Sequence, residues 1–336
     1  MTARKSPLSR ASAALDERGL LLALAAGPTS GDALARRHGL TRAAVWKKID
    51  ALRQAGMPIV ARAGQGYALA APLDLLDAEA IHAALPAPAR ARLESLAVEW
   101  RIDSTNDALL AKLPPASGAR VLLAESQRRG RGRLGRQWIS PLAAHLYLSL
   151  DRRYGGGLAR LGGLSLVAGI ATAEALRALT GLDVRLKWPN DLWLAERKLG
   201  GLLVEGGGEH GGTARAVIGL GLNVRMPAQA AAEIDQAWTD LQAHLQPPPT
   251  RSALAGAVLT AWLPALESFE QDGLAAFLPR WAALDALAGR AVRVSHDGRD
   301  YCTEALGIAE DGGLRIRAGA GERILHSGEV SVRPAS

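Results

Sequence analysis

Residues 121–138 read Val-Leu-Leu-Ala-Glu-Ser-Gln-Arg-Arg-Gly-Arg-Gly-Arg-Leu-Gly-Arg-Gln-Trp, an apolar run followed by a loop rich in glycine and arginine. Gly130, Gly132 and Gly135 have the G-x-G-x-x-G spacing of a dinucleotide-binding turn. Such a turn must open a helix, because the helix N-terminus holds the pyrophosphate. Here the loop leads to a predicted strand over residues 146–150 instead. This order argues against a dinucleotide-binding domain and indicates a loop placed between two strands.

The same loop carries five arginines within nine positions, 128–136. Glycines let the backbone approach a ligand closely, and guanidinium groups bind carboxylates and phosphates through forked hydrogen bonds. We therefore expect the loop to close over an anionic small molecule. Two alternatives fit the loop taken alone: a basic surface loop without a ligand, and a second contact to DNA.

The first 70 residues predict three helices and a hairpin. The expected elements are an arm at 1–12, helices over 14–26, 31–38 and 41–55, and strands over 58–62 and 67–69. Glycines follow each predicted helix, and Ser30 and Thr41 are suitable N-caps. Three helices with a tight turn between the second and third, followed by a hairpin, form the outline of a winged helix-turn-helix.

Charge supports a DNA-binding function for this segment. Residues 1–70 contain 11 Lys and Arg against 4 Asp and Glu, which accounts for the whole net charge of +7. The third helix has an apolar back, and cations lie off that side, as a groove-binding helix requires. The predicted DNA-binding residues are Thr41, Arg42, Lys47 and Lys48. The alternative is a small helical domain with a solvated basic face.

The rest of the chain predicts a linker and two further domains. Residues 71–92 are rich in Ala and Pro and predict a linker with one helix. Residues 93–286 mix short strands with Ala- and Leu-rich helices, the longest over 164–179. The strand candidates are 121–124, 146–150, 184–188, 191–194, 201–205 and 216–222. From residue 287 to 336, short β-prone runs alternate with turns, which predicts a small barrel.

Composition excludes several classes of protein. A single cysteine rules out a disulfide framework within the chain, and the histidines have no metal-ligand spacing. No secretory signal, membrane span or catalytic His arrangement is readable. We therefore expect a cytoplasmic protein with no membrane partner.

Four ordered motifs resemble the biotin–protein ligases. The motifs are Asp-Ser-Thr-Asn at 103–106, the Gly-Arg loop at 125–138, Lys-Trp-Pro-Asn-Asp at 187–191 and Arg-Lys-Leu-Gly-Gly-Leu-Leu-Val-Glu at 197–205. Gly-Leu-Gly-Leu-Asn-Val at 219–224 follows. With a winged helix in front, the chain is similar to the bifunctional BirA type, a ligase that also acts as the biotin operon repressor. The resemblance implies an α+β multidomain protein: the winged helix, a central mixed α/β ligase domain like a class II synthetase, and a C-terminal SH3-like β-barrel.

The resemblance also implies the chemistry. Biotin carboxylate attacks the α-phosphate of ATP to give biotinyl-5′-AMP, and a lysine of the acceptor then takes the biotin. The implied biotin-binding residues are Ser104, Thr105, Asn106, Gln127, Arg131, Gly132, Arg133 and Lys198. The implied catalytic residues are Lys187, Arg133 and Lys198, since cations should stabilise the charge that develops on oxygen. ATP is assigned to Trp138, Asn190, Asp191 and Asn223, and Mg²⁺ to Asp191.

The expected partners are a biotin carboxyl carrier protein, which is a subunit of acetyl-CoA carboxylase, and operator DNA. Bound biotinyl-AMP is expected to order the loop and to favour a homodimer that grips a two-fold operator. Three rival functions remain at this point: a regulator with a degenerate catalytic domain, a lipoate-type ligase on the related fold, and a ligase whose winged helix no longer binds DNA.

Overall fold

The computed structural model describes residues 16–155, 157, 161–208, 212–296, 299–326 and 331–334. By its internal contacts the chain divides into two units, one up to Asp74 and one from Leu75 onward, and each is described by itself. The predicted arm at residues 1–12 lies outside the described residues.

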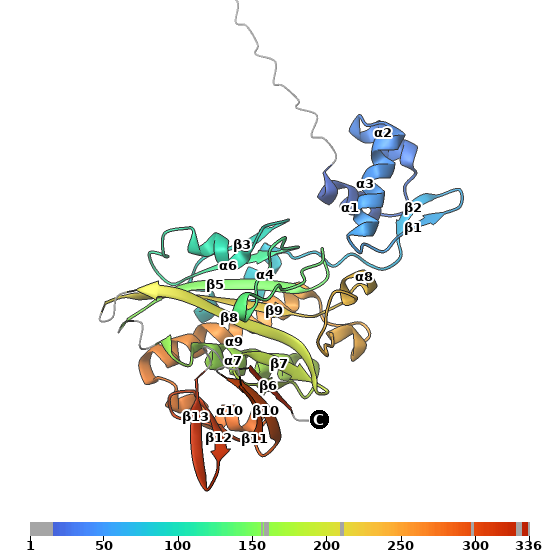
Figure 1. Ribbon diagram of the computed structural model, residues 1–336. Helices are drawn as coiled ribbons and strands as arrows, with labels where there is room; N and C mark the ends of the chain where they lie inside the picture. Colours follow the sequence, from blue (N-terminus) through green and yellow to red (C-terminus); the bar gives the residue numbers. More distant parts are fainter. Residues whose placement is uncertain are drawn as a thin grey trace, which may run out of the picture. The chain divides into compact units, whose positions relative to one another are not determined.

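The first unit contains the three helices and the hairpin expected of a winged helix (Figure 1). Its elements are α1 (Glu17–Ala25), α2 (Gly31–His38), α3 (Arg42–Gln54), β1 (Ile59–Arg62) and β2 (Gly66–Leu69), with β1 and β2 antiparallel. Ser30 and Thr41 cap α2 and α3 as predicted, because each hydroxyl accepts a backbone N–H three residues on, at 3.1 Å.

The hairpin is fastened to α3. The predicted back of α3, made of Val45, Ile49 and Leu52, is fully buried. From the same helix, the Arg53 guanidinium donates to the Ile59 carbonyl at 2.8 Å and lies 5.6 Å from the centre of the Tyr67 ring. Arg53 therefore holds the β1–β2 hairpin, the wing of this domain, against α3.

The second unit is built on a seven-stranded mixed sheet. Its strands are β3 (Leu93–Glu99), β4 (Ala119–Ala124), β5 (Leu146–Tyr154), β6 (Arg185–Lys187), β7 (Asp191–Leu194), β8 (Arg197–Gly208) and β9 (Ala214–Leu222). The strand order is β3-β4-β5-β9-β8-β7-β6, in which β3 and β4 are parallel and the other neighbours are antiparallel.

Helices cover the two faces of this sheet unequally. The long helices α7 (Leu164–Thr180) and α9 (Arg251–Asp272) pack on one face, and the short α6 (Thr105–Leu110) packs on the other (Figure 1). Along β4 the side chains alternate: Val121 and Leu123 join the large core under α7 and α9, and Leu122 joins a small core under α6. Because side chains alternate along a strand, one face of the sheet packs against the large core and the other face carries α6.

By length and composition, α9 is apolar enough to cross a membrane, and no other described helix is. It is a core helix here, since 56% of its most apolar stretch is buried inside the protein. At its first turn, Arg251 forms a buried ion pair with Glu125 at 2.7 Å, and such a pair belongs in a packed interior rather than in lipid.

The segment predicted to be a linker with one helix holds two. Residues from Leu75 belong to the second unit. There α4 (Ala78–Ala84) and α5 (Ala87–Arg90) pack on α9 through buried Ile81, Leu85 and Ala89. The remaining short elements are α8 (Ala228–Ala231), α10 (Leu278–Leu284) and three-residue turns of 3₁₀-helix at 133–135, 241–243 and 275–277.

Five antiparallel strands end the chain. They are β10 (Ala291–His296), β11 (Arg299–Ile308), β12 (Leu314–Ala318), β13 (Gly321–Leu325) and β14 (Ser331–Pro334), in the order β13-β12-β11-β10-β14. Val292, Val294 and Ile316 lie in the same apolar core as α7 and α9. The Trp188 indole N–H also donates to the Gly312 carbonyl at 2.9 Å. This β-rich region therefore shares one core with the sheet that precedes it.

Candidate functional site

One cavity of about 850 Å³ in the second unit gathers the predicted ligand-binding residues. Its lining includes every residue that the sequence assigned to biotin, ATP or Mg²⁺: Ser104, Thr105, Asn106, Gln127, Arg131, Gly132, Arg133, Trp138, Lys187, Asn190, Asp191, Lys198 and Asn223. The four cations expected to converge, Arg131, Arg133, Lys187 and Lys198, therefore do so. Their individual roles stay predictions.

The register of the sheet explains this gathering. Lys187 pairs with Asp191 across β6 and β7, Asp191 pairs with Gly201 on β8, and Gly201 pairs with Gly221 on β9. Residues paired across neighbouring strands point to the same face of a sheet. A row of site residues thus crosses four strands, on the face that carries α6.

Asp191 forms ion pairs with two lysines of the cavity, Lys187 and Lys198. The Lys198 Nζ lies 2.8 Å from one of its oxygens, and the Lys187 Nζ lies 3.7 Å from the other. All three side chains are less than a fifth exposed, so this charge cluster is screened by protein more than by water. The lysine ammonium groups also lie over aromatic rings, Lys187 over Trp193 at 5.4 Å and Lys198 over Trp138 at 5.5 Å.

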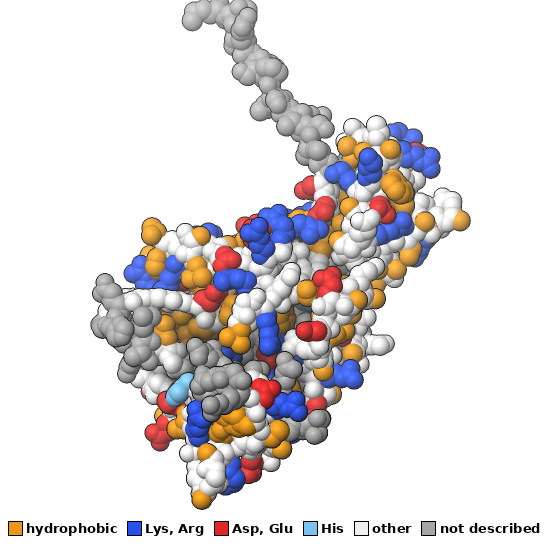
Figure 2. Space-filling model, in the orientation of Figure 1, with side chains coloured by type: hydrophobic (Ala, Val, Ile, Leu, Met, Phe, Trp, Pro, Cys, Tyr) orange, Lys and Arg blue, Asp and Glu red, His pale blue; other side chains and the backbone are white. Residues whose placement is uncertain are grey.

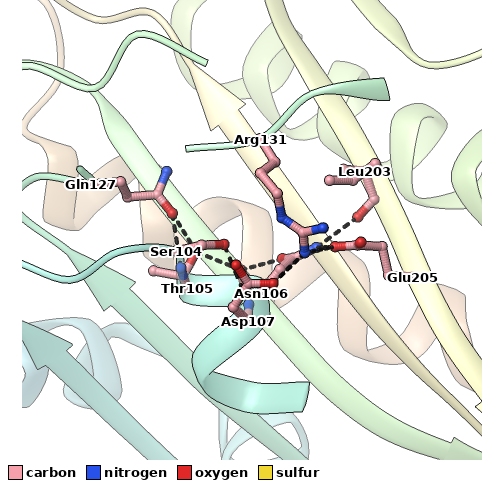
Figure 3. Close-up of polar contacts among 9 residues, drawn as sticks. Ser104, Thr105, Asn106, Asp107, Gln127, Arg131, Leu203 and Glu205 are labelled. Atoms are coloured by element: carbon pink, nitrogen blue, oxygen red, sulfur yellow. Dashed lines mark hydrogen bonds and ion pairs between the residues drawn. The ribbon is translucent and has the colours of Figure 1, made fainter. Parts of the chain in front are cut away.

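The Ser-Thr-Asn motif begins α6 and is held from two sides (Figure 3). Ser104 is the N-cap, and the Thr105 backbone N–H donates to Oε1 of Gln127 at 2.8 Å. Ser149, fully buried on β5, places its hydroxyl 2.7 Å from Thr105 Oγ1 and 2.6 Å from Asn106 Oδ1. The predicted helix cap and the predicted polar set thus coexist in the same residues.

Asn106 is oriented by the sheet. Its amide N–H groups donate to Glu205 at 2.9 Å and to the Leu203 carbonyl at 3.3 Å, both on β8. Gly219 lies directly opposite Ser149 and Leu203 in the register. A Cβ added to Gly219 would lie 2.4 Å from Asn106 Oδ1, so only glycine leaves room for this amide.

The second glycine of the Gly-Leu-Gly motif makes room for Trp138. A Cβ on Gly221 would lie 2.4 Å from Cε2 of the indole ring. Among the described residues the Trp138 indole N–H is buried and has no hydrogen-bond partner. The motif at 219–224 therefore shapes the cavity by the absence of side chains at two positions.

The Gly-Arg loop folds back on itself beside the cavity. The Gly132 N–H donates to the Arg136 carbonyl at 2.7 Å, and the Trp138 N–H donates to the Gly130 carbonyl at 2.8 Å. Leu134, between them, has a positive φ of 55° and is 60% exposed.

Two loop arginines take different partners. Arg131 reaches over α6 and β8 to Asp107 and Glu205, the latter at 2.7 Å (Figure 3). Arg133 is more buried and donates to Asn190 Oδ1 at 3.3 Å. Burial lowers the pKa of Arg133, and the charge of Asp191 works in the opposite direction. Arg131 and Arg128 thus each have an acidic partner within their own unit, which for Arg128 is Asp103.

Asn190 and Asn223 connect backbone segments at the edge of the cavity. Asn190 Nδ2 donates to the Leu202 carbonyl at 2.6 Å, and Asn223 Nδ2 donates to the Thr239 carbonyl at 3.1 Å. Both amides thus hold neighbouring chain segments in place while they line the cavity.

Among the described residues, no group of three or more His, Cys, Asp or Glu side chains is arranged to hold a metal. Asp191 is a single carboxylate that already faces two ammonium groups. Such a residue fits a Mg²⁺ carried in by nucleotide phosphates, since Mg²⁺ in nucleotide sites uses one or two carboxylates and takes its other ligands from phosphates and water.

The buried histidine of this unit has a structural setting. His145 is fully buried; its Nδ1 accepts the Val224 N–H at 3.0 Å, and its Nε2 lies 3.4 Å from the Met226 sulfur. Burial lowers its pKa to about 3, which keeps the ring neutral. It does not line the cavity.

Sequence reasoning missed Ser149, Asp107 and Glu205. Glu205 closes a quoted motif and Asp107 follows one, so proximity to a motif was the available signal for both. Ser149 gave no such signal, because its place beneath the Ser-Thr-Asn motif depends on the pairing of β5 with β9.

The predicted DNA-binding residues lie together in the first unit, at and after the start of α3. Thr41 caps the helix, Arg42 has a side chain 79% exposed with Asp32 3.8 Å away, Lys47 is exposed and Lys48 is half-buried. Lys and Arg side chains are visible on the surface of this unit (Figure 2). The placement agrees with the prediction, and the DNA contacts themselves stay predicted.

Family models match all three parts of the chain. The biotin/lipoate A/B protein ligase family matches residues 98–223, an HTH domain matches 20–68, and a biotin protein ligase C-terminal domain matches 288–333. The bifunctional ligase/repressor BirA of Escherichia coli is 40% identical over 309 residues, which are 91% of this chain and 93% of that protein. The chain belongs to the BirA family of bifunctional ligase/repressors.

Other relatives of this family agree with the assignment. The BirA of Salmonella typhimurium is also 40% identical, over 91% of this chain and 93% of its own length. A solved structure, the biotin protein ligase from Aquifex aeolicus in complex with biotin and ATP, is 28% identical with a TM-score of 0.62. It covers 72% of this chain and 100% of that one. The central BirA-family domain thus has the fold of biotin ligases, like the class II synthetases, as predicted.

Proposed function

We propose that the protein is an ATP-dependent biotin–protein ligase and a DNA-binding repressor of biotin synthesis genes. It forms biotinyl-5′-AMP and transfers biotin to a lysine of the biotin carboxyl carrier protein, a subunit of acetyl-CoA carboxylase. One observation carries the proposal: Arg131, Arg133, Lys187 and Lys198 surround a single cavity that also contains the polar Ser-Thr-Asn set.

The polar set suits the ureido ring of biotin. A ureido group needs hydrogen-bond donors and an acceptor in a largely enclosed pocket. Ser104, Thr105, Asn106 and Gln127 provide hydroxyl and amide groups there. Ser149 fixes two of these side chains from beneath, which orients them before the ligand arrives.

The cations suit the two steps of the reaction. In the first, a carboxylate oxygen of biotin bonds to the α-phosphorus and pyrophosphate leaves. In the second, the acceptor amine bonds to the acyl carbon, loses a proton, and AMP leaves. Both steps place negative charge on oxygens, which Arg133, Lys187 and Lys198 stabilise. Lys198 is assigned to the biotin carboxylate, and Arg131 with Gly132 to closure over the ligand.

The nucleotide occupies the end of the cavity near Trp138. The indole offers a flat face to adenine, and Asn190 and Asn223 shape the pocket around it. Asp191 would hold the Mg²⁺ that accompanies ATP, and this ion would offset part of the negative charge of the phosphates.

The repressor function uses the winged helix. Bound biotinyl-AMP orders the loop, and ordering favours a homodimer that places two α3 helices on a two-fold operator. The C-terminal strands form an SH3-like domain that completes the ATP and acceptor sites; in support, Val332 of β14 lines the cavity. A cytoplasmic location accords with ATP, operator DNA and a carrier protein as ligands.

Mass spectrometry for biotinyl-adenylate, after mixing the protein with biotin and Mg-ATP, tests the ligase. We expect the adenylate with the wild type, almost none with Lys198→Met, and wild-type amounts with Lys112→Met, an exposed lysine outside the cavity. An avidin blot with a carrier domain then follows the transfer step. Absence of adenylate from the wild type would indicate a degenerate regulator, and preferential adenylation of lipoate a lipoate-type ligase.

Operator binding tests the repressor. Affinity for operator DNA should rise when biotin and ATP are both present, and it should fall with added salt. Affinity unchanged by both ligands would disprove the coupling, and absence of salt-dependent binding would leave only the ligase.

A further inference from the structure

The recognition helix α3 exposes a tryptophan. Trp46 is 51% exposed, although Val45 and Ile49 beside it are fully buried. The other large apolar side chains that the described residues leave exposed are aliphatic: Leu22, Val60, Leu113, Leu134, Leu179 and Ile324. Trp46 is therefore the one exposed aromatic side chain of this set.

Trp46 lies in the cationic half of α3. It is one helical turn after Arg42 and is followed by Lys47. One turn further, Asp50 accepts a hydrogen bond from Gln54 at 2.8 Å, so the acidic side chain of α3 lies in its C-terminal half. In helix-turn-helix proteins the second helix of the motif, which is α3 here, contacts base edges in the major groove through its N-terminal residues. Trp46 occupies that part of the helix, with cations on either side of it.

The major groove has one apolar feature that an indole can match. Thymine presents its 5-methyl group there, and apolar side chains read it by contact. We propose that Trp46 contacts a thymine methyl group in the major groove of operator DNA and thereby contributes to operator choice. This inference rests on the proposed DNA-binding function.

The test uses the full-length protein with biotin and Mg-ATP. A duplex is first selected from a random-sequence DNA pool, and each thymine is then replaced by deoxyuridine, which removes only the methyl group. Replacement of one thymine in each half-site should weaken binding about 15-fold, which is about fourfold for each of the two buried methyl groups. Trp46→Ala should bind more weakly and be indifferent to that replacement.

Two variants serve as controls. Leu22→Ala removes a comparably exposed apolar side chain, 48% exposed on α1, and should keep the methyl effect. Lys47→Ala should weaken binding to all duplexes about equally and lower the salt dependence, as loss of a phosphate contact does. All three variants should keep the wild-type circular dichroism spectrum and thermal unfolding transition, which shows that the first unit is folded, and they should ligate biotin at the wild-type rate.

The outcomes separate the two hypotheses. If the pool yields no selected duplex, the DNA-binding function fails and the inference with it. If a duplex is selected but the deoxyuridine effect persists in Trp46→Ala, only the inference fails. A Trp46→Ala variant that changes its sedimentation without DNA would assign the indole to a protein contact and would also overturn the inference.

Discussion

The two faces of the seven-stranded sheet have different functions, although the same strands form both. On β5, Leu148 enters the core under α7 and α9, and its neighbour Ser149 holds the Ser-Thr-Asn motif on the opposite face. On β9, Ile218 enters the core, and Gly219 leaves space for Asn106. One face is filled with apolar side chains for stability, and the other is hollowed by glycines for a ligand. Substitutions of adjacent residues should therefore separate stability from activity.

The largest effect is expected at Gly219. Gly219→Ala places a methyl group where Asn106 Oδ1 lies, so the polar set must move. We expect kcat/KM for biotin to fall by about 10²-fold, with little change in the melting temperature. Gly207→Ala on β8 is the matched control, since no atom lies within 4 Å of its added Cβ. A Gly219→Ala enzyme that keeps wild-type kcat/KM would show that the site face tolerates a side chain there.

The core face should respond to Leu148→Ala in stability. Leu148 is fully buried, so truncation leaves a cavity and should lower the free energy of unfolding by about 2–5 kcal/mol. Denaturant unfolding measures the loss, and the KM for biotin at low temperature should stay within about twofold of wild type. A large rise in KM with unchanged stability would contradict the division between the faces.

A smaller effect concerns pH and the fully buried His145. The pKa of His145 falls to about 3 on folding, below its usual value near 6.5. The unfolded chain therefore binds a proton that the folded protein excludes, and stability is lost as pH falls below 6.5. Between pH 6.5 and 5 the free energy of unfolding should drop by about 1.5 kcal/mol. In His145→Asn, which keeps an acceptor for Val224, this part of the slope should vanish; an unchanged slope would refute the assignment.

The smallest effect is expected at the rim of the site face. Asp107→Asn removes one of the two acidic partners of Arg131, and both side chains are 40–51% exposed. Solvent screening limits such a pair to about 1 kcal/mol or less, so the KM for biotin should rise at most about fivefold, and less at high salt. Asp103→Asn, which removes the partner of Arg128, is the control and should leave KM unchanged. An effect on kcat alone would contradict this role for Arg131.

Local signals predicted the site better than the sheet. The caps at Ser30 and Thr41 and the back of α3 followed from local residue types and short-range periodicity. The site residues that line the cavity followed from motifs that resemble those of the biotin–protein ligases. The strand β3 was not predicted, because Leu93–Glu99 alternates weakly and carries two glutamates. The partners of Asn106 depend on the pairing of β5, β8 and β9, which no local sequence encodes.

The C-terminal strands are a second case in which long-range packing could not be predicted from the sequence. Turn signals after Leu287 predicted a separate module, and the five strands are present. Their apolar residues nevertheless belong to the core of the preceding sheet, because burial of both surfaces together removes more apolar area from water than burial of either alone. Spacing along the chain cannot reveal such sharing.

That shared core governs where the protein can be cut for biotechnology. A fragment that ends before residue 287 would strip the cover from Trp188, whose indole donates to Gly312, and would uncover the buried patch that meets Val292 and Val294. The chain divides into its two compact units between Asp74 and Leu75. A shortened enzyme for biotin labelling, without the DNA-binding unit, should therefore start near residue 75 and keep all residues to the C-terminus.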